Sequence, residues 1–171
     1  VCSSDLQKQF FMMTQGAVPE PIPCPVWDVI FQNINYAYLD NVKCGSNSQF
    51  NEVMWFYPSS ASVDGTNDSY VCYNTLYHEW DFGQINRNFW INQSILGSPI
   101  ACDSNGYIYQ HETSNDNAGL PINAYFQTGY FSLESGNELV FVDWLLPDFK
   151  FGQWNQPSNA TMQISFNVED Y

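Results

Sequence analysis

Positive charge is the scarcest property of this sequence. Its 171 residues contain only four lysine and arginine residues against eighteen aspartate and glutamate residues, which gives a formal net charge of −14. These cations, Lys8, Lys43, Arg87 and Lys150, are far apart in the sequence. Proteins that bind nucleic acid in its grooves neutralise phosphates with clusters of lysine and arginine. The sequence therefore argues against groove binding and predicts an acidic surface that repels DNA and anionic lipid.

Several chemical motifs are also missing. No apolar run reaches membrane-spanning length, so we expect no membrane-spanning segment. The five cysteines include no CxxC pair, which argues against a zinc site, and their odd number favours reduced thiols, several of them buried. There is no G-x-S-x-G motif and no glycine-rich phosphate loop. We therefore expect no enzyme activity, no cofactor, and no catalytic, cofactor-binding or metal-binding residue.

Aromatic residues, in contrast, are abundant. They make up 18% of the chain, with 13 Phe, 11 Tyr and 6 Trp. Large rings suit the pleated, half-buried surface of a sheet, and glycine and proline recur throughout the chain. The composition therefore predicts an all-β fold built from antiparallel meanders.

The first 120 residues divide into three parts. Residues 1–6 read Val-Cys-Ser-Ser-Asp-Leu and resemble a translated sequencing adapter, so we expect them to be non-native and the natural protein to be longer. Residues 7–50 predict a strand over 8–15, a proline-rich loop over 16–25, and a short helix over Trp27–Leu39, where apolar residues recur four apart. A strand over Trp27–Phe31 stays open as an alternative. Residues 51–120 predict two blade-like antiparallel meanders.

The strands of these meanders are expected at 52–57, 69–74, 79–83, 88–91, 98–102 and 106–111. Asn105-Gly106 predicts a type I′ hairpin turn. The runs Tyr70–Asn74 and Tyr107–Gln110 correspond at a spacing of 37 residues, and repeated antiparallel units of about 40 residues are typical of β-propeller blades. Residues 121–171 predict a sandwich-like region with longer strands, at 122–128, 130–133, 138–146 and 160–168, which we expect to be cut short at its end.

Four groups of residues are candidate sites. His111 and Glu112 form the most enzyme-like pair, but neighbours in a strand point to opposite faces, so we expect them not to converge. Carboxylates could serve a glycosidase, but eighteen acids supply close pairs by chance. The runs Asp64–Asp68 and Asn115–Asn117 could hold calcium, but turn residues alone explain both runs. The tryptophans could form a sugar-binding platform, although we favour packing roles for most of them. These tryptophans and the loop carboxylates are Trp55, Trp80, Trp90, Trp144, Trp154, Asp64, Asp68, Asp116 and Asp148.

Several runs of the chain resemble a known family. These are Pro21–Phe31, Phe50–Ser59, Asp68–Asn74, Trp80 with Gly83, Pro99–Ala101, Gly106–Glu112 and Leu146–Asp148. Together they resemble the tail nozzle or hub proteins of tailed bacteriophages, the group described as stabilising packaged DNA. The resemblance covers nearly the whole chain after the first six residues, and its motifs carry no catalytic residue.

The resemblance implies a function and partners. It implies a structural virion protein with β-propeller domains, assembled in the host cytoplasm and located in the tail. Such a protein forms a homo-oligomeric ring, a hexamer by this resemblance, around the DNA exit channel. Its neighbours are portal or adaptor and tail fibre proteins, and DNA passes without sequence-specific contact. The alternative from a different class is a receptor- or carbohydrate-binding tail fibre module, or a glycan depolymerase.

Overall fold

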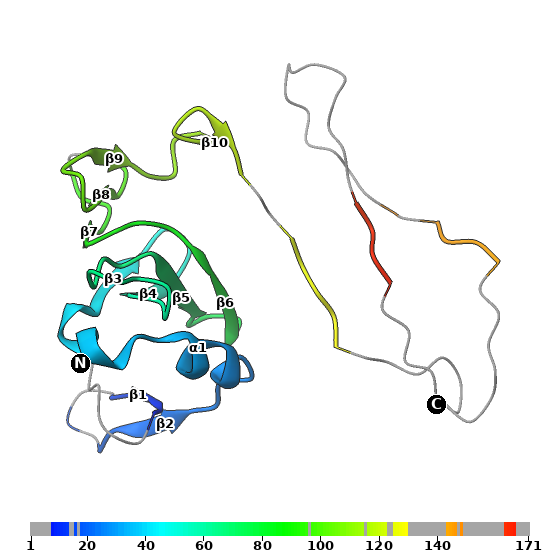
Figure 1. The fold of residues 1–171 in the computed structure, drawn as a ribbon, viewed down its shortest axis with the longest axis horizontal. Helices are drawn as coiled ribbons and strands as arrows, with labels where there is room; N and C mark the ends of the chain where they lie inside the picture. The colour runs from blue at the N-terminus through cyan, green and yellow to red at the C-terminus, as the bar shows by residue number, and fades with distance from the viewer. Residues whose placement is uncertain are drawn as a thin grey trace. The chain divides into compact units, whose positions relative to one another are not determined.

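The fold is taken from a computed structural model, which describes residues 8–13, 16, 18–95, 97–114, 116–122, 125–129, 143–146, 148 and 163–166. Contacts divide the chain into two units, 1–124 and 125–171. The described helices and strands all belong to the first unit, shown in Figure 1. The predicted longer strands of 121–171 lie mostly outside the described residues, and the described residues of the second unit are in no strand.

A four-stranded antiparallel sheet forms the centre of the first unit. Its strands β3 (Lys43–Asn47), β4 (Glu52–Tyr57), β5 (Ser69–Asn74) and β6 (Glu79–Gln84) pair in chain order. The predicted bounds of β4 and β5 are confirmed, and β6 is one residue longer than predicted. β3 was not predicted, because a run with one apolar residue among Lys, Gly, Ser and Asn reads as a turn. This meander begins at residue 43, before the expected boundary at 51.

A smaller sheet follows in the chain. It contains β7 (Phe89–Ile91), β8 (Ile100–Cys102) and β9 (Ile108–Gln110), again antiparallel and in chain order. The three strands were predicted, although each is shorter than expected. The type I′ assignment of the β8–β9 turn is wrong, because Gly106 has a φ of 87° while Asn105 is not in the positive region that this turn requires. Asp103 Oδ1 instead accepts hydrogen bonds from the backbone nitrogens of Asn105 and Tyr107.

The N-terminal part forms a layer of its own. β1 (Phe10–Met12) and β2 (Glu20–Ile22) make a hairpin, followed by α1 (Trp27–Asn33) and the 3-10 helix η1 (Tyr36–Asn41). The predicted helix over 27–39 is therefore interrupted. At Ile34 the backbone is extended, with ψ at 138°, and forms a bridge with Ser59. A short hairpin of β10 (Asp116–Asn117) and β11 (Leu120–Pro121) lies after β9 in the chain.

The central sheet is covered on both faces. On one face, Tyr57 and Val71 pack with Ile30 and Ile34 of the N-terminal layer. On the other face, Met54, Phe56 and Cys72 form a second cluster against which Trp90 of β7 packs. Figure 1 shows the two covering layers on opposite sides of β3–β6. The described residues thus form a mostly β fold of antiparallel sheets with few helices, as predicted, and none of their four sheets closes on itself.

Within the described part of the chain, no helix has the length and apolar character to cross a membrane.

Candidate functional site

Arg87 is the centre of a partly buried polar cluster beside β9. The side chain is only 6% exposed, and its Nε donates to His111 Nε2 over 2.9 Å. Its guanidinium lies 4.0 Å from the centre of the Tyr109 ring, and Tyr109 donates its hydroxyl to Asp103. The His111 ring also packs against Trp90, with 4.7 Å between ring centres. These contacts anchor the end of β9 to the segment before β7.

The geometry makes His111 a structural acceptor. Burial, followed by the charge of Arg87, lowers the pKa of His111 from 6.5 to about 4. The ring is therefore neutral at pH 7, with Nε2 accepting from Arg87. Glu112, whose φ is 59°, leads away and accepts a hydrogen bond from Asn47. The two neighbours have different partners, in agreement with the expectation that they do not converge.

The predicted loop carboxylates hold turns together. Asp64 accepts from the Thr66 nitrogen and the Ser62 hydroxyl, which lowers its pKa. Asp68 accepts from the backbone nitrogen and the hydroxyl of Ser59. Asp64 therefore caps a turn close to it in sequence, as turn composition predicts, while Asp68 joins the start of β5 to Ser59, nine residues earlier.

The same capping role extends to Asp116, which accepts from the Gly119 nitrogen and the Ser114 hydroxyl. Asp148 belongs to the second unit and is exposed, and Asn115 lies outside the described residues. No group of three or more His, Cys, Asp or Glu side chains is close enough to hold a metal ion in the described part of the chain. The Asp64–Asp68 loop thus offers two capping carboxylates but no such cluster.

Three of the five candidate tryptophans pack inside the first unit. Trp55 and Trp80 stack with 6.2 Å between ring centres, and Phe10 contacts both. Trp80 also donates its indole N–H to Pro23 O, and Trp90 donates to Ser46 O. These rings join layers of the fold and do not form an exposed platform. Trp144 of the second unit is 76% exposed, and Trp154 lies outside the described residues.

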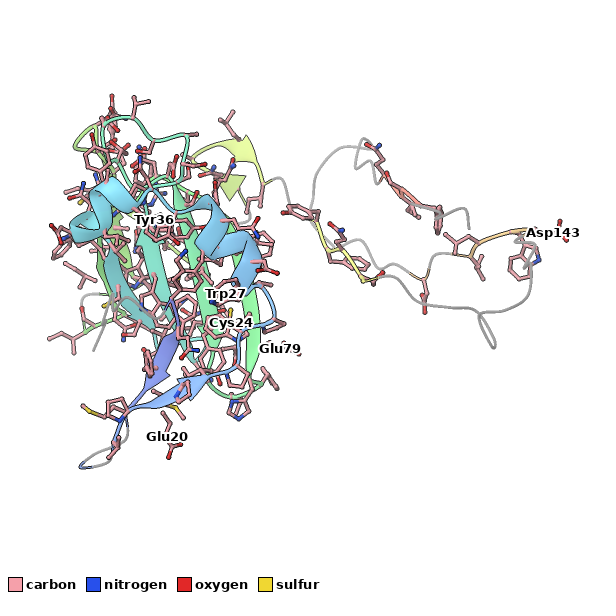
Figure 2. The ribbon with its side chains drawn as sticks, turned by 60° about the horizontal axis from the view of Figure 1, so that its bottom comes forward. Glu20, Cys24, Trp27, Tyr36, Glu79 and Asp143 are labelled. Carbon is pink, nitrogen blue, oxygen red and sulfur yellow. The ribbon has the colours of Figure 1, made fainter. Side chains whose placement is uncertain are left out.

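A hollow of about 230 Å³ lies between the β1–β2 hairpin and the start of α1. Prolines and apolar side chains form most of its wall, together with the Cys24 thiol, whose pKa is raised by burial. Cys24 and Trp27 lie close together at this end of the layer, and Glu20 is at its outer tip (Figure 2). The described cysteines are free thiols, but only Cys72 is buried among them, so the expectation that several are buried is wrong.

The smaller sheet has an uncharged outward face. The alternation that turns Trp90, Ala101 and Tyr109 inward places one row of side chains on the opposite face. That row contains Phe89, Ile91, Ile100, Cys102, Ile108 and Gln110. Phe89, Ile91 and Ile108 are 55%, 52% and 75% exposed. Sequence reasoning assigned the strands but not this face, because period-two alternation does not show which side faces a neighbour.

A further polar cluster was not predicted from the sequence. Asn47, at the end of β3, donates from Nδ2 to Glu52 and to Glu112. The short spacing of Asn47 and Glu52 around a turn is a local signal for their contact. Glu112 lies 65 residues from Asn47, so only the packing of the two sheets brings it to this place.

Comparison of the chain with protein-family models, with curated proteins and with solved structures gives no significant match.

Proposed function

We propose that this chain is a structural virion protein of a tailed phage, part of the tail nozzle or hub that retains packaged DNA and conducts it out. The family resemblance of its sequence motifs supports the proposal. The four-stranded meander in chain order also supports it, since consecutive antiparallel strands are the topology of a propeller blade. In this role the chain forms a sixfold ring with copies of itself and contacts portal or adaptor and fibre proteins.

The observation that carries the proposal is the uncharged outward face of the β7–β9 sheet. Three large apolar side chains, Phe89, Ile91 and Ile108, are each more than half exposed there. Contiguous exposed apolar surface marks contact sites in soluble proteins. The partner for this face is a second copy of the chain. Because each copy carries a net charge of −14, copies approach each other most easily where charged side chains are absent.

The excess of acidic over basic residues is consistent with a channel through which DNA passes. A wall that attracted the phosphate backbone would slow the duplex, whereas an acidic wall lets it slide. The proposal also accounts for the placement of the candidate catalytic groups, since His111, Asp64, Asp68 and Asp116 each make contacts that stabilise a turn or a strand end.

Electron microscopy of the purified chain tests this function. We expect closed rings with a central channel, and we expect duplex DNA to be retained no longer than a neutral polymer of equal length. Monomers that bind polysaccharide would contradict the proposal and favour the fibre or depolymerase alternative. A ring whose channel wall is basic would contradict the conduit mechanism alone.

A further inference from the structure

The first unit carries a second uncharged surface, in the layer that covers the other face of the central sheet from β7–β9. This surface is the open hollow of about 230 Å³ between the β1–β2 hairpin and the start of α1. Aromatic, proline and aliphatic side chains line it together with Gln9 and Cys24, and its wall holds no charged residue. Trp27 is 37% exposed there, and Pro21 is exposed. The hollow is therefore a neutral and mostly apolar concavity in a chain of net charge −14.

The uncharged face of β7–β9 carries side chains that fit such a concavity. The strand register places Cys102 between Phe89 and Ile108 on this face. Phe89 and Ile108 are 55% and 75% exposed, so both project into solvent. A cavity of about 150 Å³ holds a benzene ring, so the hollow has room for the ring of Phe89 from another copy. The two surfaces therefore match in size, in apolar character and in lack of charge.

The positions of the two surfaces decide what kind of assembly they can form. They belong to layers on opposite sides of the central sheet, so they cannot meet within one copy (Figure 1). A contact between two different surfaces of identical chains joins the copies head to tail, into a closed ring or an open filament. A contact of the β7–β9 face with itself would stop at two copies. A ring built from one kind of contact thus needs a second surface, and the hollow supplies it.

We propose that the uncharged face of β7–β9 in one copy packs into the hollow between the β1–β2 hairpin and α1 of the next copy. The large apolar side chains of the face enter the hollow, and both surfaces lose their contact with water. The contact brings Cys102 of one copy towards Cys24 of the next, because each thiol lies within its own surface. This inference rests on the proposed function, since it specifies which surfaces of the chain join in the ring.

Cross-linking of the full wild-type chain tests the contact. A short bismaleimide joins thiols that lie close together, and a mixture of isotope-labelled and unlabelled chain lets mass spectrometry identify links between copies. We expect Cys24 of one copy to be linked to Cys102 of another, and Cys24→Ser and Cys102→Ser each to lose the link. Cys44→Ser is the matched control and should keep the link, because Cys44 is an exposed thiol on β3, outside both surfaces. An assembled chain in which Cys102 is linked only to Cys102, or in which Cys24 is linked to no other copy, would overturn the proposal.

Two variants studied by sedimentation velocity separate the surfaces. Pro21→Lys places charge in the wall of the hollow and Ile91→Lys places charge on the face, so each should be a monomer alone. An equal mixture should form a species of twice the 19.6 kDa chain mass, because one variant keeps an intact face and the other an intact hollow. Pro19→Lys is the matched control, since Pro19 is an exposed proline outside the wall of the hollow, and it should assemble like the wild type.

The outcomes distinguish this contact from the proposed function. If Pro21→Lys assembles as well as the wild type, or if the mixture stays monomeric, the hollow is not the partner surface. The proposed contact is then overturned, while a ring formed by the wild type still supports the proposed function. If the wild-type chain is itself a monomer, the proposed function fails and the contact fails with it.

Discussion

The two faces of the central sheet are buried by different kinds of contact. The face towards α1 is aromatic and aliphatic, with Trp55, Val71 and Trp80 in contact with the N-terminal layer. The opposite face mixes Phe56 and Met54 with acids at its margin, among them Glu52 and Asp81. The first face is stabilised by buried apolar surface and by contacts between aromatic rings. The second face depends on the packing of Trp90 and on a few polar contacts. Substitutions on the two faces should therefore differ in size and in their response to pH.

Trp80→Ala on the aromatic face should have the largest effect. The ring contacts Phe10, Trp55 and Tyr73 and donates its N–H to Pro23 O, so its loss separates the β1–β2 hairpin from the sheet. We expect a loss of about 3–5 kcal/mol in the free energy of unfolding, measured by urea titration. Tyr77→Ala removes an exposed aromatic ring and serves as the control. If Trp80→Ala lowered the free energy of unfolding by less than Gly45→Ala on the opposite face, the aromatic face would not be the more important one for stability.

Gly45→Ala tests the opposite face. A Cβ at Gly45 would lie 2.5–2.8 Å from three atoms of the Trp90 side chain, so the indole must move. Overpacking of this kind costs about 1–3 kcal/mol. Thermal unfolding of Gly45→Ala should show this loss, while Gly129→Ala, where a Cβ would meet nothing within 4 Å, should leave the midpoint unchanged. An unaltered midpoint for Gly45→Ala would show that Trp90 is not held against β3.

The pH dependence of stability should be smaller. The pKa of His111 is lowered to about 4 in the folded chain, so the unfolded chain binds the proton more readily. The contribution of neutral His111 to the free energy of unfolding is therefore complete above pH 6.5 and is lost as the pH falls towards 4. Since solvent screens this half-buried ring, we expect a loss on the order of 1 kcal/mol. His111→Gln keeps an acceptor for Arg87 without titrating, so the difference between the two stability curves isolates this group. Parallel curves from pH 7 to pH 4 would contradict the assignment.

Thiol reactivity should distinguish the faces without changing stability. Cys72 is 5% exposed, and burial with the charges of Glu52 and Asp81 raises its pKa to about 12. Cys44 is exposed on the edge strand β3. Iodoacetamide at pH 8 should therefore modify Cys44 well before Cys72, as mass spectrometry of digests will show. Equal rates would mean that the Phe56 side of the sheet opens readily.

The sequence predicts β4, β5 and β6 of the central sheet well and the edge strand β3 poorly. β4 and β5 are apolar or aromatic runs bounded by Pro58 and by Asn-Asp turns, so their bounds follow from local chemistry. β3 has no such pattern, because it is held by its register with β4 and by the Trp90 side chain above Gly45. The interruption at Ile34 depends on its bridge to Ser59, which no helical periodicity reveals.

The polar clusters divide in the same way. Asp64 and Asp116 accept hydrogen bonds from residues two or three positions away, so composition alone predicted their roles, whereas Asp68 accepts from Ser59, nine positions away. The contact of Asn47 with Glu112 joins residues 65 positions apart and results from the packing of two sheets. Local sequence patterns cannot predict such a contact, because neither segment's own residues indicate which distant segment it will pack against.

Sedimentation velocity of the wild-type chain beside Ile91→Lys tests the central claim, that copies of the chain assemble through the uncharged face of β7–β9. Ile91 is 52% exposed on that face, so a lysine there fits the isolated fold but places charge in the contact. We predict a wild-type species several times heavier than the 19.6 kDa chain, and a variant that sediments as a monomer with an unchanged unfolding temperature. A monomeric wild type, or a variant that assembles as well as the wild type, would contradict the claim.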